Sequence, residues 1–220
     1  MGKRGTKPKN KVKIKWSGNF AYAMGLIATD GNLSPDGRHI NFTSKDIEQI
    51  ANFMKALEIE CNIGKKSNGH VKHKKYFVIQ FGDVNFYSFL NSIGLKPNKS
   101  KTIGSIKLPS KYFFDFLRGC FDGDGCFYSY WDKRWKSSFM FYTEFVSASQ
   151  KHILWLQDEI FRRINIKGHI TKGGNNSCYQ LKYAKSDSLK LLKKIYYKGD
   201  LICLDRKKLK IRKILGNIAK

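Results

Sequence analysis

Two aspartates hold the same place in two similar nonapeptides of the sequence. The first nonapeptide spans residues 23–31, reads AMGLIATDG and contains Asp30; the second spans residues 117–125, reads LRGCFDGDG and contains Asp124. Both have glycine third, then an apolar pair, and both end in Asp-Gly. Carboxylates are hard oxygen ligands that suit Mg²⁺. Metal ions held by paired carboxylates can activate water and stabilise the leaving oxygen in phosphodiester cleavage. The pair therefore suggests metal-assisted hydrolysis.

The glycines inside the nonapeptides predict two closely packed helices. Glycine costs about 1 kcal/mol relative to alanine inside a helix, so Gly25 and Gly119 suggest places where two backbones meet. Each helix should end at the glycine after its aspartate. The acids would then lie at helix C-termini, where the dipole disfavours negative charge, and in parallel helices they would also repel each other. A divalent cation between them would relieve both effects. Two unrelated Asp-Gly turns would not explain the match between the flanking segments.

The segments after each nonapeptide follow the same order. Residues that alternate in polarity predict strands, and apolar residues at helical spacing predict helices. In the first half, we expect a hairpin with its turn signal at 35–37 that leads into a strand over 38–44. A helix over 46–57, a second alternating strand over 76–81 and a helix over 85–93 should follow. In the second half, residues 139–147, 150–164, 178–183 and 186–196 take these roles.

Each half therefore has the outline αββαββα, which predicts an α+β fold of two pseudo-symmetric repeats. Helices would cover one face of each antiparallel sheet and leave the other face open and polar. The two halves side by side would form a saddle. The expected divisions are a basic N-terminal extension at 1–17, a first repeat at 18–99, a connector at 100–111 and a second repeat at 112–220.

The charge of the chain indicates a polyanionic partner. Lys and Arg number 42 against 17 Asp and Glu, so the formal net charge is +25. Such an excess repels itself unless a polyanion neutralises it, and nucleic acid is favoured over an anionic membrane surface. No apolar run approaches the roughly 20 residues of a spanning helix, and no signal peptide is visible. Five scattered cysteines without a C-x-x-C pair indicate a reduced intracellular protein without a zinc site.

Both nonapeptides resemble the LAGLIDADG motif of homing endonucleases, and residues 116–125 are closest to the second motif of single-chain members. The resemblance extends from about Gly18 to the end of the sequence. It implies motif helices at the centre, sheets in the DNA major groove and Mg²⁺-dependent double-strand cleavage, as in intron homing. The eighth motif position supplies the metal-binding acid, which here is Asp30 or Asp124. The sixth position differs between the repeats, Ala28 against Asp122, so we expect Asp122 to serve packing or hydrogen bonding instead.

Basic residues beside the motifs are further catalytic candidates. Lys45 follows the first long strand, but Ala148 stands at the matching place in the second repeat, so the two strands of DNA could be cut at different rates. Lys99 precedes the connector, and its counterpart is Lys207. A lysine near the scissile phosphate could polarise water or stabilise developing charge. Gly31 and Gly125, which follow the acids directly, complete the expected metal-binding positions.

Polar residues on the strands are the candidates for DNA recognition. Side chains on the open sheet faces can read base edges in the major groove, while Lys and Arg in the turns mainly contact phosphates. The candidate DNA-binding residues are Arg38, His39, Asn41, Thr43, Ser44, Lys72, Lys74, Tyr76, Gln80, Arg134, Lys136, Tyr142, Glu144, Lys172, Gln180 and Lys182.

The sequence thus predicts a site-specific endonuclease that acts on double-stranded DNA as a monomer, without a membrane or a protein partner. Mg²⁺ is the expected cofactor, Mn²⁺ is an alternative, and Ca²⁺ should support binding without efficient cleavage. The expected location is intracellular, in the cytoplasm, at the nucleoid or in an organelle. The alternatives are an RNA-splicing maturase and a non-catalytic DNA-binding protein on the same fold. The presence of both acids favours cleavage.

Overall fold

The computed structural model describes residues 10–68, 71–173 and 178–216; for residues 67, 68 and 71–75 it describes the backbone only. The first repeat contains α1 (Gly18–Asp30), β1 (Gly31–Leu33), β2 (His39–Ser44), α2 (Ile47–Leu57), β3 (Gly64–Asn68), β4 (Val71–Gly82) and α3 (Val84–Ile93). Two short 3₁₀ turns, η1 (Lys99–Lys101) and η2 (Ser110–Tyr112), flank the connector. The second repeat contains α4 (Phe113–Asp124), β5 (Cys126–Trp131), β6 (Phe139–Ser147), α5 (Gln150–Ile164), β7 (His169–Lys172), β8 (Tyr179–Ala184), α6 (Lys185–Ile195) and α7 (Asp205–Gly216).

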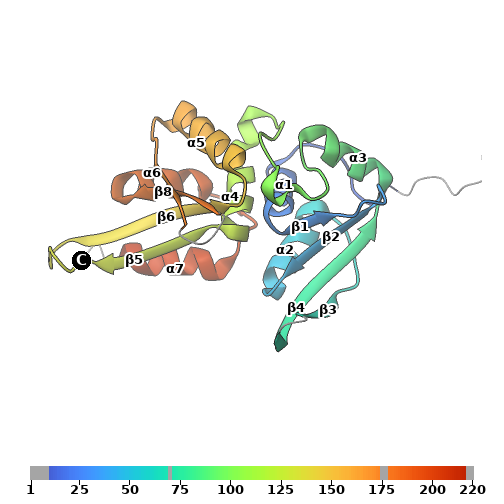
Figure 1. Ribbon diagram of the computed structural model, residues 1–220, viewed down its shortest axis with the longest axis horizontal. Coiled ribbons are helices and arrows are strands. Elements are labelled where there is room, and N and C mark those ends of the chain that lie inside the picture. The colour runs from blue at the N-terminus through green and yellow to red at the C-terminus, as the bar shows by residue number, and fades with distance from the viewer. Residues whose placement is uncertain (1–9, 69–70, 174–177, 217–220) are drawn as a thin grey trace, which may run out of the picture.

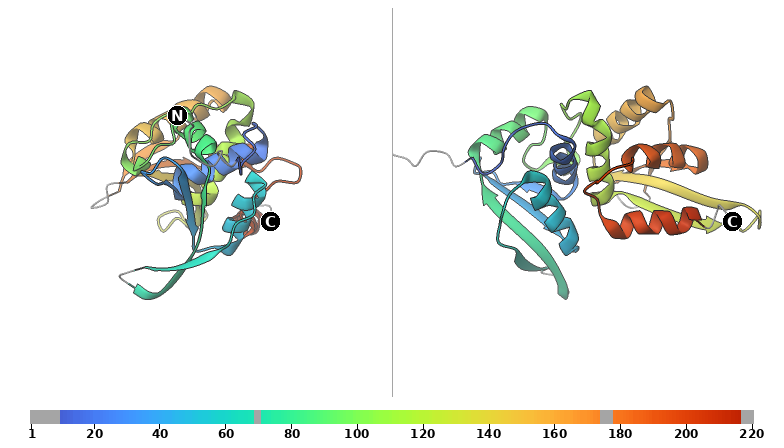
Figure 2. Two further views of the ribbon diagram at one scale, coloured as in Figure 1. Left: turned by 90° about the vertical axis from the view of Figure 1, so that its right-hand side faces the viewer. Right: turned by 180° about the vertical axis from the view of Figure 1, so that it is seen from behind.

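Two antiparallel four-stranded sheets lie on either side of the central helices α1 and α4 (Figure 1). Their strand orders, β1-β2-β4-β3 and β5-β6-β8-β7, are the same in the two repeats. The predicted α+β fold of two αββαββα repeats is therefore confirmed. The view from behind shows the same arrangement, with α7 running beneath the strands of the second sheet (Figure 2).

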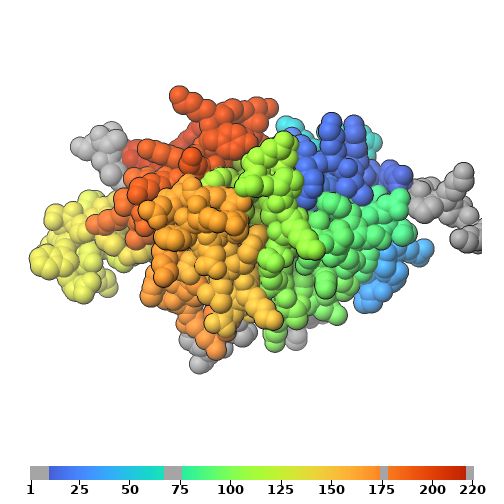
Figure 3. All heavy atoms as spheres, turned by 90° about the horizontal axis from the view of Figure 1, so that it is seen from above, coloured from blue at the N-terminus to red at the C-terminus, as the bar shows by residue number. Residues whose placement is uncertain are grey.

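Each sheet has one buried and one open face, as the alternation in the sequence predicted. Along β2, Ile40 and Phe42 are fully buried, while His39, Asn41 and Thr43 are partly exposed. The buried ring of Phe42 stacks on Phe53 of α2 with a centroid distance of 4.3 Å, which fixes this helix on the sheet. The seam between the helices of the two repeats is visible from above, where the connector in light green lies beside α5 in orange (Figure 3).

The element boundaries differ from the predicted ones by a few residues. Asp46 lies just before α2 as its N-cap, and its side chain accepts a hydrogen bond from the Glu48 amide. β4 is longer than predicted because it begins at Val71 rather than at residue 76. The basic segment at 207–213 lies within α7, which follows a loop that returns from α6 to the centre of the molecule.

A buried arginine anchors that returning loop. Arg118 of α4 is fully buried; its Nε donates a hydrogen bond to Ile202 O (3.0 Å) and its Nη1 to Ile195 O (3.2 Å). Its Nη2 lies 2.9 Å from Asp115 Oδ1 in an ion pair whose angles are not those of a hydrogen bond. A buried cation requires such partners because its desolvation is costly. The loop after α6 is thereby held against α4, and this position of the loop places Lys207 at the end of the central helices.

Candidate active site at the ends of the central helices

The central helices meet through their glycines. A Cβ atom on Gly25 would lie 2.9 Å from Gly119 Cα and 2.8 Å from Cys120 N, and a Cβ on Gly119 would lie 2.9 Å from Gly25 Cα. The contacts are reciprocal, because Gly25 also faces Phe116 O and Gly119 faces Tyr22 O, the matching residue of the other repeat. Toward the ends of the helices, a Cβ on Gly123 would lie 3.0 Å from Asp30 Oδ2, so the two helices run in the same direction. Their C-terminal ends, and the acids there, therefore lie together.

Asp30 and Asp124 share this end of the helix pair. Burial raises the pKa of Asp30 from its ordinary 3.8 to about 6, with a further contribution from the charge of Asp124. Asp124 is exposed at the mouth of the site, yet the surrounding helix ends shield its carboxylate from water and raise its pKa as well. The positive charges of Lys99 and Lys207 act in the opposite direction and lower the pKa values of both aspartates. Two carboxylates that the fold keeps close despite this cost form a natural site for a cation.

Two lysines, Lys99 and Lys207, close the site from opposite repeats. Lys99 is almost fully buried and its Nζ donates a hydrogen bond to Gly31 O. Lys207 Nζ donates to Gly125 O (2.6 Å), Phe121 O (2.6 Å) and Gly123 O (3.2 Å). Cations at helix C-termini are stabilised by the helix dipole. Burial lowers the pKa of each lysine to about 8, and the nearby aspartates oppose that shift. The predicted match between these two lysines is present in the structure.

A glutamine that sequence analysis did not single out also contacts the site. Gln49 of α2 is buried, and its Nε2 donates hydrogen bonds to Asp30 Oδ2 (3.1 Å) and Asp122 O (3.4 Å). Its Oε1 accepts a hydrogen bond from Ser44 Oγ (2.9 Å). The only available sequence signal was its position on the first turn of the helix after the Ser44 strand. Ser44 thereby contacts the site through Gln49.

The second repeat has a histidine where the first has this glutamine. His152 follows Ser147 by five residues, as Gln49 follows Ser44. Its Nδ1 lies 2.8 Å from Gly104 O in the connector, and it makes no hydrogen bond to Asp124 among the contacts of the described residues. Burial lowers the pKa of His152 to about 4, so it is neutral at physiological pH. The two acids therefore have different neighbours.

Asp122 has the structural role expected of it. The buried carboxylate accepts hydrogen bonds from Tyr22 OH (2.8 Å), Tyr196 OH (3.0 Å) and the Leu204 amide (2.7 Å). Three donors compensate for the burial of this acid. They also tie the first central helix and the returning loop to α4. No oxygen of Asp122 needs a metal ion to satisfy it.

The remaining catalytic candidate, Lys45, contacts the first sheet. It is exposed, and its Nζ stands 5.4 Å from the centre of the Tyr76 ring on the first sheet. In the described parts of the chain, no cluster of three or more His, Cys, Asp or Glu side chains is poised to hold a metal ion. A metal at this site would therefore depend on the two aspartates and on other oxygen atoms.

The candidate DNA-binding residues fall into two groups. Ser44 is the exception among the strand residues, because it lies on the buried face of β2 with Ile40 and Phe42. The other strand residues lie on the open faces, where Glu144 is buried and the rest are at least partly exposed: His39, Asn41, Thr43, Tyr76, Gln80, Tyr142, Gln180 and Lys182. Arg38, Arg134, Lys136 and Lys172 are exposed at strand ends or turns. The side chains of Lys72 and Lys74 lie outside the described residues.

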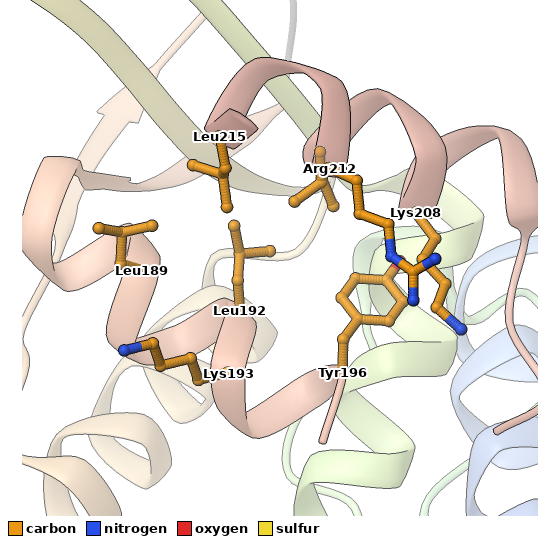
Figure 4. Close-up of a pocket in the computed structure, with 8 residues that line it drawn as sticks. Leu189, Leu192, Lys193, Tyr196, Lys208, Arg212 and Leu215 are labelled. Carbon is orange, nitrogen blue, oxygen red and sulfur yellow. The ribbon is translucent and has the colours of Figure 1, made fainter. Parts of the chain in front are cut away.

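An apolar cavity lies away from these residues. A cavity of about 210 Å³ lies between α6 and α7, and its lining includes Leu189, Leu192 and Leu215 with Lys193, Lys208 and Arg212 (Figure 4). It has no carboxylate in its lining. The titratable groups converge instead at the helix ends, which form the candidate active site. None of the helices in the described residues combines the length and the apolar character needed to cross a bilayer.

Comparison with solved structures places the fold. No known family model matches the sequence. No curated protein matches it either. Similar structures include I-DmoI in complex with DNA and Ca (TM-score 0.58, 14% identity, 88% of this chain and 97% of that one) and the I-LtrWI LAGLIDADG homing endonuclease bound to target DNA (TM-score 0.57, 13% identity, 92% and 90%). Full-length DUF199/WhiA from Thermatoga maritima is also similar (TM-score 0.57, 19% identity), over 94% of this chain but only 64% of that one. The chain therefore has the fold of the LAGLIDADG homing endonucleases, which the DUF199/WhiA protein shares.

Proposed function

We propose that this chain is a site-specific homing endonuclease that binds a long double-stranded DNA target and hydrolyses one phosphodiester in each strand. The observation that carries the proposal is the meeting of Asp30 and Asp124 at the ends of two helices in contact through Gly25 and Gly119. A fold that only needed two turns would not hold two acids together at helix C-termini, where charge is disfavoured. A cation bound between the two carboxylates would offset the cost of holding their negative charges there.

The donor set suits a hard divalent cation. Asp30 and Asp124 would hold Mg²⁺, or Mn²⁺ in its place, and the carbonyl oxygens of Gly31 and Gly125 are the further ligands that we propose. A carbonyl oxygen has two lone pairs, so each can accept its lysine and still face an ion. The ion would supply charge stabilisation and activation of water at the phosphate. The structures of I-DmoI with DNA and Mn and with DNA and Ca support this choice of ions.

The side chains around the acids have defined tasks in this proposal. Lys99 and Lys207, with pKa values of about 8, are protonated at neutral pH and place positive charge where charge develops on the phosphate. Gln49 orients the Asp30 carboxylate through its amide. Lys45 is a further candidate that would act on DNA laid across the first sheet rather than on the acids.

Double-stranded DNA is the partner that best fits the surface. The net charge of +25 favours a polyanion, and each sheet offers one open face with polar side chains. Side chains of these strands would contact base edges, and the basic turns would contact phosphates. I-LtrWI, which has the same fold, is bound to its target DNA. We propose that one chain with two repeats serves both half-sites as an intracellular monomer, and that the repeats divide at residues 18–99 and 112–220.

The test separates binding from cleavage. The parent protein is incubated with a randomised duplex library, first in Ca²⁺ to select bound duplexes and then in Mg²⁺ to sequence the cleaved ends. Asp30→Asn and Asp124→Asn should each nearly abolish double-strand cleavage and leave binding intact. The matched control is Asp158→Asn, which changes an exposed acid of α5 and should cut at the parent rate. If the parent binds but never cuts, the chain is a non-catalytic DNA-binding protein. If it binds RNA in preference to any duplex, the maturase alternative replaces the proposal.

A further inference from the structure

The two open sheet faces present different side chains at equivalent positions beside the acids. In the first sheet, one row across the strands is formed by Asn32, Asn41 and Gln80, because Asn41 pairs with both of the others. In the second sheet, Glu144 pairs with Cys126 and Lys182 in the same pattern. Each row begins two residues after the aspartate of its repeat. The two rows are therefore related by the pseudo-symmetry of the molecule, but their chemistry is not the same.

The first row consists of three amides. Asn32 and Gln80 are exposed, and Asn41 is half-buried with its Nδ2 donating to Ser34 Oγ (3.2 Å). An amide carries a donor and an acceptor side by side. Adenine presents the complementary pair, N7 and the N6 amino group, in the major groove, so Asn and Gln are its usual readers.

The second row joins an acid to a lysine. Glu144 is the only acidic residue of the strands that the structure describes. Its Oε2 lies 3.8 Å from Lys182 Nζ, and the side chains of Glu144 and Lys182 are 9% and 26% exposed. The next row outward holds the rings of Tyr128 and Tyr142, stacked with centroids 5.3 Å apart. A carboxylate on a surface that meets phosphates is repelled unless it accepts a hydrogen bond from the DNA. Cytosine N4 is such a donor, and lysine is a usual reader of guanine O6 and N7.

We propose that the two rows select different base pairs at pseudo-symmetric positions of the target: A·T opposite Asn32, Asn41 and Gln80, and G·C opposite Glu144 and Lys182. This inference rests on the proposed binding of duplex DNA, but it does not require cleavage. It gives the target one polarity, since only one orientation of the chain matches both half-sites.

The experiment is a selection of duplexes from a randomised library by binding in Ca²⁺. The parent protein should enrich A·T at one position and G·C at the mirror position, each about tenfold over the other pairs, which is equivalent to about 1.4 kcal/mol. The decisive variant carries Glu144→Asn and Lys182→Gln together, which copies Asn41 and Gln80 of the first row into the second sheet and leaves Cys126 unchanged. Its G·C preference should change to A·T, while the other half-site keeps its bases.

Two further variants make the result decisive. Lys190→Gln removes one exposed charge on the helical side and should leave every base preference as in the parent. Lys182→Gln alone changes the more exposed member of the pair, and if the double variant fails to fold, this single change should still abolish the preference for guanine. Mirror positions with the same preference, or a G·C preference that survives these changes, would overturn the inference. A parent that enriches these bases but never cuts in Mg²⁺ would overturn the proposed nuclease and leave this inference standing; a parent that enriches no sequence would overturn both.

Discussion

Replacing Asp30 with asparagine should stabilise the metal-free protein at neutral pH. The folded state raises the pKa of Asp30 from 3.8 to about 6, so the ionised form is less favourable there than in the unfolded chain. A difference of this size corresponds to an upper limit of about 3 kcal/mol. Asp30 is half-buried, so water screens part of this cost. We expect Asp30→Asn to raise the free energy of unfolding by about 1–2 kcal/mol at pH 7.5.

The sign of the pH dependence follows from proton binding. Between about pH 4 and pH 6 the folded state holds a proton on Asp30 that the unfolded chain has lost. The stability contribution of this group is therefore full below pH 4 and falls as the pH rises through about 6. Asparagine does not titrate, so the gain from the substitution should be near zero at pH 4 and complete above pH 6.5. Urea unfolding of both proteins in EDTA, at pH values from 4 to 7.5, measures this difference.

The geometry permits the substitution without loss of the local hydrogen bond. In Asp30→Asn the new side-chain amide keeps a carbonyl oxygen that can accept from Gln49 Nε2, as the carboxylate does at 3.1 Å. Asp158→Asn, at an exposed position of α5, controls for the loss of one charge. A variant that is less stable than the parent at pH 7.5, or a gain that does not depend on pH, would refute the reasoning. Saturating Mg²⁺ should reverse the order of stability, since it binds the parent more tightly.

Three further outcomes are expected. Gly25→Ala should destabilise the protein by about 3 kcal/mol in thermal unfolding because its Cβ would meet the backbone of α4, whereas Gly104→Ala, with open space around it, should change little. Duplex binding should weaken steeply with salt, with a log–log slope of about −0.9 for each phosphate contact, and a flat plot would contradict binding through the basic surface. Plasmid cleavage should pass through a nicked intermediate, because Asp30 accepts a hydrogen bond from Gln49 and Asp124 has no equivalent contact among the described residues. A time course in which both strands are cut simultaneously would show that this difference has no effect on cleavage.

Local patterns in the sequence were sufficient to predict the repeat and most elements. The Gly-x-x-x-x-Asp-Gly spacing of both nonapeptides places a contact glycine and an acid on each central helix, and the structure has Gly25 against Gly119. The alternation in β2 correctly sorted Ile40 and Phe42 from their polar neighbours. Such patterns lie within single helices and strands, so they can be recognised in the sequence before it is known which other elements these helices and strands contact.

Contacts that depend on distant segments were harder to predict. Gln49 reaches Asp30 because α2 crosses the end of α1, and a single amphipathic helix gives no sign of that. The open-face position of Glu144 follows from alternation, but its ion pair with Lys182 depends on β6 and β8 lying side by side, which alternation does not reveal. Lys207 reaches α4 because Arg118 and Asp122 hold the preceding loop. Each of these contacts joins residues from different elements of the fold.

The two repeats have kept their backbone plan while their side chains have diverged. The strand orders match, and Lys99 and Lys207 take equivalent places on Gly31 and Gly125. Around this shared frame, Gln49 corresponds in position to His152, Lys45 corresponds to Ala148, and three amides correspond to an acid–lysine pair. A protein made of two identical copies would need both half-sites to be equal. If one chain binds the duplex as proposed, each sheet could match its own half-site, and the common frame would need to keep only the two acids together.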